Sequence, residues 1–81
     1  MIEKKIKKRL QKKLKKAEIF IQDMTGNNNH FNVIIISDSF IDLALIEQHK
    51  MIYSLLDDMI TKEIHALQLK TLTWKQWKKQ N

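Results

Sequence analysis

The spacing of the apolar residues changes along this 81-residue chain, and it limits the fold more than any other feature of the sequence. Residues 2–16 place them at every fourth position, which is typical of a helix with a narrow apolar face. Residues 42–60 and 74–80 also have helical spacing. Alternating or continuous apolar residues predict three strands, at residues 17–24, 31–37 and 63–73. The sequence therefore predicts an α+β fold with the element order αββαβα.

Ser39 precedes the predicted second helix and stands three residues before Asp42. This spacing is typical of a capping box, so we expect Ser39 to cap the N-terminus of that helix. The apolar stripe of this helix is expected to contain Leu45, His49, Ile52, Leu56 and Met59 or Ile60. His49 thus falls among apolar residues. We interpret it as a packed histidine whose ring N–H is hydrogen-bonded, and not as a ligand.

The connections between the predicted strands bring two histidines together. A short turn at residues 25–29 makes the first two strands antiparallel, whereas the helix between the second and third predicts a parallel pair. His30 and His65 begin these parallel strands, so we expect them near each other at one edge of a three-stranded mixed sheet. Adjacent strands lie about 4.8 Å apart, and neutral imidazoles are good ligands for iron and zinc. Taken singly, each histidine is more often a structural residue, at a turn or a strand end, than a ligand.

The size and the cysteine content of the chain limit what such a site can hold. A chain of 81 residues is expected to form one domain, residues 1–81, with little room for a deep pocket. It has no cysteine, so it cannot hold an iron–sulfur cluster by itself, because clusters need mostly thiolate ligands. We expect a cytoplasmic protein without membrane attachment, since the N-terminus has no apolar signal-peptide core and no apolar run is long enough to cross a bilayer.

Several catalytic patterns are missing from the sequence. The one glycine, Gly26, excludes a G-x-G-x-x-G fingerprint and a P-loop, both of which need several glycines. There is no H-E-x-x-H, no Cys/His zinc spacing and no G-x-S-x-G elbow. Asp57 and Asp58 are neighbours in a predicted helix, so they would point about 100° apart and not form a carboxylate pair. We therefore expect a protein that is not an enzyme.

The positive charge is concentrated in residues 1–16, which hold nine of the fifteen Lys and Arg residues and one acid, a net charge of +8. Residues 17–81 have a net charge of −2. One interpretation is a solvated basic helix, residues 1–16, followed by the sheet and helices of residues 17–81. The other is electrostatic contact with nucleic acid or another anionic surface, weak and salt-sensitive because lysine reads little base identity. The candidate contact residues are Lys4, Lys5, Lys8, Arg9, Lys12, Lys13 and Lys16.

Four segments of the sequence together resemble the BolA family. They are HFNVIIISDSF at residues 30–40, LIEQHKMIYSLL at 45–56, EIHALQLKTLT at 63–73 and TWKQW at 73–77. The likeness runs from Thr25 to Trp77, in order and at the family's spacing. It implies a class II KH-like αββαβα domain. The chain departs from the family pattern at Asp42, where many members have Gly, at Gln48, which replaces an Arg, and at Trp74, which replaces a Pro.

The resemblance implies a partner, a monothiol glutaredoxin, in a heterodimer that shares a [2Fe–2S] cluster. The glutaredoxin and a glutathione would give sulfur ligands, and His65 would give an imidazole. His30 is the candidate second ligand, although the family's loop ligand often stands earlier, where this chain has residues 27–29. The isolated chain is expected to bind no cluster. The implied role is in iron–sulfur cluster assembly or trafficking and in iron homeostasis.

Two alternatives remain open at the level of the sequence. Some members of the family are DNA-binding transcription regulators, which the basic first helix would suit. A KH domain grips nucleic acid with a GXXG loop, and Gly26 alone cannot form one, so contact would involve the first helix, the second helix or the third strand. The other alternative is a protein–protein module that uses the apolar sheet face and holds no metal. A weak homodimer is also compatible with the sequence.

Overall fold

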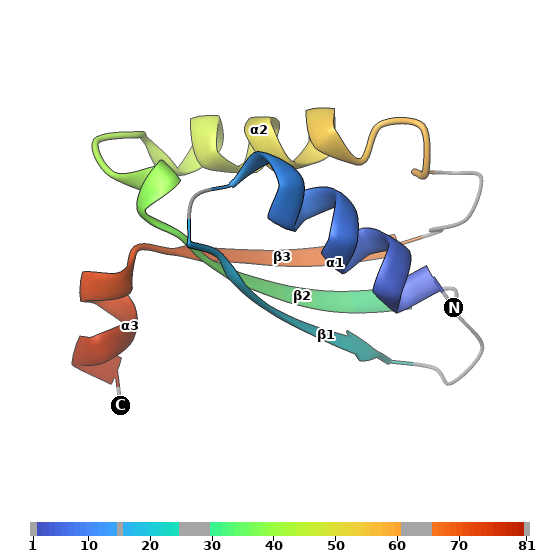
Figure 1. The fold of residues 1–81 in the computed structure, drawn as a ribbon, viewed down its shortest axis with the longest axis horizontal. Helices are drawn as coiled ribbons and strands as arrows, with labels where there is room; N and C mark the ends of the chain where they lie inside the picture. Colours follow the sequence, from blue (N-terminus) through green and yellow to red (C-terminus); the bar gives the residue numbers. More distant parts are fainter. Residues whose placement is uncertain (1, 15, 25–29, 61–65, 81) are drawn as a thin grey trace.

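The computed structural model describes residues 2–14, 16–24, 30–60 and 66–80 (Figure 1). Its elements are α1 (Ile2–Lys13), β1 (Glu18–Asp23), β2 (His30–Ile36), the 3-10 turn η1 (Asp38–Phe40), α2 (Leu45–Leu55), β3 (Ala66–Leu72) and α3 (Trp74–Gln80). This confirms the predicted αββαβα order and adds η1 before α2. None of the helices in these ranges is long and apolar enough to cross a membrane.

The three strands form one mixed sheet in the order β1-β2-β3, as predicted. β1 is antiparallel to β2, and β2 is parallel to β3. Because side chains alternate across a strand, odd-numbered residues face α1 and α2 and even-numbered residues face away. Ile35 lies between Ile19 and Thr71 on the covered face, and Ile34 lies beside Phe20 and Lys70 on the other.

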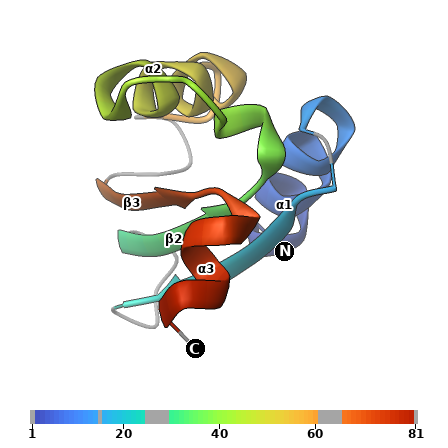
Figure 2. The same ribbon diagram turned by 90° about the vertical axis from the view of Figure 1, so that its left-hand side faces the viewer.

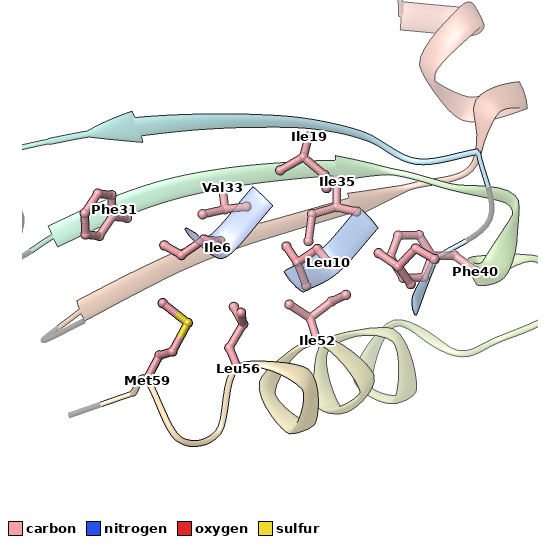
Figure 3. Packing of buried hydrophobic residues seen from close by; sticks show 11 residues of the cluster. Ile6, Leu10, Ile19, Phe31, Val33, Ile35, Phe40, Ile52, Leu56 and Met59 are labelled. Carbon is pink, nitrogen blue, oxygen red and sulfur yellow. The ribbon is translucent and has the colours of Figure 1, made fainter. Parts of the chain in front are cut away.

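The core fills the space between the covered face of the sheet and the two helices α1 and α2 (Figure 3). The predicted stripe of α1 is confirmed, since Ile6 and Leu10 are fully buried and Leu14 nearly so. Each buried Ile or Leu contributes roughly 1.5–3 kcal/mol by removal from water. The other fully or almost fully buried apolar residues of this cluster are Ile19, Phe31, Val33, Ile35, Phe40, Ile52, Leu56 and Met59. The lysines of α1 therefore lie on a helix whose apolar side is buried in the core.

The second helix is shorter than the sequence predicted. Ser37, and not Ser39, caps a turn, because its hydroxyl accepts a hydrogen bond from the Ser39 N–H at the start of η1. Asp42 has φ of 65°, a left-handed conformation that a helix cannot contain. The predicted start at Asp42 is thus wrong, and α2 begins at Leu45. The helix also ends at Leu55, and residues 56–59 continue as turns.

The buried side of α2 differs from the predicted stripe at its first two members. Ile52, Leu56 and Met59 are fully buried as expected, but Leu45 is 61% exposed. Gln48 is buried instead, because its side-chain amide forms hydrogen bonds with the Phe40 and Leu43 carbonyls and the Thr71 hydroxyl. His49 is partly buried, and its Nε2 has no hydrogen-bond partner among the described residues. The expectation of a hydrogen-bonded ring is therefore not met at this nitrogen.

The terminal helix α3 lies at one end of the sheet (Figure 2), and its two tryptophans connect it to the rest of the fold. Thr73 and Gln76 form a reciprocal capping box, in which each side chain accepts from the other's backbone N–H. Trp74 Nε1 donates to the Lys16 carbonyl at 2.8 Å. Trp77 stacks on Phe20, with ring centroids 5.6 Å apart. α3 therefore packs against β1 and the α1–β1 connection.

Candidate functional site

The start of the parallel strands contains one of the two predicted ligands. His30 is the first residue of β2, and its neighbour across the sheet is Ala66, the first residue of β3. Both residues are exposed. His65 directly precedes Ala66 in the sequence but lies outside the described residues. The predicted meeting of His30 and His65 thus stays a prediction, although the parallel pairing of β2 and β3 on which it rests is confirmed.

His30 combines a fixed backbone with an exposed imidazole. Its carbonyl accepts a hydrogen bond of 2.8 Å from the Met24 N–H, which closes the β1–β2 pair. As an even-numbered strand residue it belongs to the face turned away from α1 and α2. An exposed imidazole on a fixed strand is accessible to a ligand from outside the chain.

The donor set of this chain decides what such a site is able to bind. No group of three or more His, Cys, Asp or Glu residues that suits a metal ion occurs within the described ranges. The sequence contains three histidines and no cysteine. Imidazole is a suitable ligand for an iron–sulfur cluster only where thiolates complete the set. A cluster at His30 would therefore need its sulfur ligands from another molecule.

Gln48 is a polar residue whose importance the sequence did not reveal. Its Nε2 donates to the Leu43 carbonyl at 2.9 Å and to the Phe40 carbonyl at 3.4 Å. Its Oε1 accepts a bond of 2.6 Å from the Thr71 hydroxyl. Gln48 thus links η1, α2 and β3 within the protein interior. Its partners are all protein groups, so we interpret this residue as structural.

The predicted contact residues of α1 divide between different sides of the helix. All are exposed except Arg9, which is partly buried. Four of them line one surface depression, which we call the basic flank: Lys5, Lys8, Arg9 and Lys12. Lys4 lies in a different depression, together with Lys7, Ile19 and Ile21. Lys13 ends α1, and Lys16 follows it with φ of 44°.

An ion pair joins the basic flank to the turn after α2. The Arg9 guanidinium donates to the Asp58 carboxylate, and the two side chains are 31% and 66% exposed. The hydrogen bond from Arg9 lowers the pKa of Asp58, and the charges of Arg9 and Lys5 add to this effect. Exposed ion pairs contribute little to stability. The pair does, however, hold Arg9 in place and set a negative charge at the rim of the flank.

Three helices and a three-stranded mixed sheet define an α+β domain. The sequence pattern of BolA-like proteins matches residues 4–76. The chain belongs to the BolA-like family.

Known proteins resemble the chain in both sequence and fold. A relative in Escherichia coli K12, described as the DNA-binding transcriptional regulator BolA, is 32% identical over 89% of this chain and 79% of that protein. An uncharacterized protein of Buchnera aphidicola is 49% identical over 60% of this chain, and the match spans about half (47%) of that protein's length. The solved structure of BolA1 from Arabidopsis thaliana has a TM-score of 0.82 and 30% identity, over 89% of this chain and 90% of that one.

Proposed function

We propose that this BolA-like chain is a non-enzymatic adaptor that carries a [2Fe–2S] cluster jointly with a monothiol glutaredoxin. The observation that carries the proposal is the parallel register in which His30 stands beside Ala66, the residue after His65. β2, which begins at His30, and β3, which begins at the residue after His65 in the sequence, therefore start from one end of the sheet. In this proposal His65 is the principal ligand and His30 the second candidate.

The absence of cysteine supports a shared site and not a site of this chain alone. The partner and its glutathione would supply the sulfur ligands, and this chain would supply imidazole. Imidazole in place of thiolate raises the reduction potential of a cluster. The role that follows is in cluster assembly or trafficking and in iron homeostasis.

The proposal is tested by mixing the purified chain with a cluster-loaded monothiol glutaredoxin and recording visible absorption and circular dichroism. We expect His65→Ala to change the spectrum of the heterocomplex, and His30→Thr to change it where His30 is the second ligand. His49→Ala is the matched control, because it removes the third histidine from a different element, α2. A His65→Ala complex with the spectrum of the parent would show the ligand assignment to be wrong.

A second candidate function is DNA binding in transcription regulation. It is favoured by the description of the Escherichia coli relative as a DNA-binding transcriptional regulator and by the basic flank of α1. The test is DNA affinity measured against salt, in the parent and in a chain whose α1 lysines are replaced by glutamine. Sequence-specific binding that survives the replacement supports a regulator. Loss of all binding shows that the contact was non-specific attraction to phosphates.

A further inference from the structure

The basic flank follows one side of α1 over about two turns. Its members stand at positions 5, 8, 9 and 12, and residues three or four apart are neighbours on a helix surface. At 1.5 Å per residue, the flank extends about 10 Å along the helix axis. Four cations over this length match a line of phosphates better than a single small anion.

Two features of α1 narrow the class of ligand. Its apolar side chains Ile6 and Leu10 are fully buried against the core, so the helix has no apolar face to insert into a membrane. Arg9 adds a planar guanidinium that binds phosphate in bidentate fashion, whereas the lysines provide point charges. This combination suits the backbone of a nucleic acid.

Asp58 is an acid bonded to this flank. It accepts from Arg9 and therefore occupies the one arginine of the chain. A phosphate at Arg9 would have to displace this carboxylate and approach its negative charge. Because both groups are partly or largely exposed, the pair is weak enough to exchange.

We propose that the basic flank binds the phosphate backbone of duplex DNA without reading its sequence, and that Asp58 weakens this binding by holding Arg9. The proposal rests on the DNA-binding candidate and assigns a surface and a restraint to its phosphate contact alone; any reading of base sequence would belong to other elements. It does not depend on cluster sharing.

The first experiment compares two double variants of equal charge. Lys5→Gln with Lys8→Gln removes two cations from the flank, and Lys4→Gln with Lys7→Gln removes two from the separate depression that Glu3, Ile19 and Ile21 also line. Three to four phosphate contacts predict that parental affinity for a random duplex falls about 40- to 150-fold between 50 and 200 mM salt. We expect the first variant to reduce the slope of log affinity against log salt by about 1.8, and the control to leave it nearly unchanged.

The second experiment compares Asp58→Asn with Asp57→Asn. Both variants change the net charge equally. Asp57 is exposed and lines a separate depression with Lys50 and Tyr53. We expect Asp58→Asn to bind about three- to tenfold more tightly than Asp57→Asn at 50 mM salt, with a slope steeper by about 1, because Arg9 becomes available to a phosphate. Adding Arg9→Gln to both should remove the difference.

DNA binding, the role of the basic flank and the restraint by Asp58 are each overturned by a different result. No binding of DNA by the folded parent at 50 mM salt overturns both the DNA-binding candidate and the flank. Equal losses in the two lysine double variants overturn the flank alone. Equal affinities of Asp58→Asn and Asp57→Asn overturn the restraint by Asp58. Far-ultraviolet circular dichroism and thermal unfolding of each variant establish that the compared proteins are folded.

Discussion

Where β2 leads into η1 and β3 leads into α3, which we call the closed end, polar groups are buried and bonded. Ser37 is fully buried and its N–H donates to the Leu72 carbonyl at 2.9 Å. Thr71 is 5% exposed and bonds to Gln48. At the other end of the same two strands, the open end, His30 and Ala66 are exposed.

The open end is held differently, by apolar packing and by a surface ion pair. Phe31 and Met59 are buried beneath it (Figure 3), and Arg9 with Asp58 joins α1 to the turn after α2. The hydrogen bonds that orient η1, α2 and β3 thus lie away from the candidate ligand His30. We therefore expect substitutions of the exposed residues at the open end, His30 and Ala66, to change the stability of the fold little.

The largest expected effect is at the closed end, where Phe40 is 1% exposed and belongs to the core. We expect Phe40→Ala to lower the free energy of unfolding by about 3–5 kcal/mol, because it removes a buried ring and leaves a cavity. Urea unfolding followed by circular dichroism measures this. A loss below about 1 kcal/mol would mean that the closed end does not anchor the fold.

Gln48 should have the next largest effect. Gln48→Leu leaves the Thr71 hydroxyl and the Leu43 carbonyl without their partner, and we expect a loss of about 2 kcal/mol in the free energy of unfolding. Thr71→Val tests the same bond from the other side. Coupling between the two substitutions in a double-mutant cycle should reach about 0.5–3 kcal/mol. Additive effects would show that the 2.6 Å bond contributes nothing beyond packing.

The same residues show why part of the fold could be predicted from the sequence and part could not. Alternation and helical spacing identified the three strands and the three α-helices but not η1, because burial of apolar faces determines the former. The start of α2 depended on Asp42, whose left-handed φ is a backbone property; the Gly that many BolA relatives carry at this position was the available signal. Gln48 was missed because its partners at Phe40, Leu43 and Thr71 become neighbours only in the folded chain.

The candidate site was predicted in the same uneven way. Topology rules alone placed the start of β2 beside the start of β3, and the register agrees at His30 and Ala66. The sequence did not predict that the α1 lysines divide between the basic flank and a second depression that contains Lys4 and Lys7. It depends on where β1 and the end of α2 lie around the helix, as the Arg9–Asp58 pair shows.

A smaller effect on stability is expected at the open end. His30→Thr keeps a residue suited to a strand, and the ladder bonds of this position come from its backbone. We expect the free energy of unfolding to change by less than about 0.5 kcal/mol. Urea unfolding of this variant beside Phe40→Ala measures the contrast between the ends. A loss above about 1 kcal/mol would give His30 a structural role and weaken its candidacy as a ligand.

The smallest effect concerns the pH dependence contributed by Asp58. Its pKa in the folded chain is lowered below the ordinary value of 3.8 by the hydrogen bond from Arg9. The contribution of the carboxylate to stability is therefore fully present above that value and is lost as the pH falls through the lower pKa of the folded state. Urea midpoints of the parent and Asp58→Asn, measured from about pH 2.5 to 6, should differ above pH 4 and converge at the acid end. Parallel curves would show that the ion pair does not persist in solution, which would also remove the restraint proposed for Arg9.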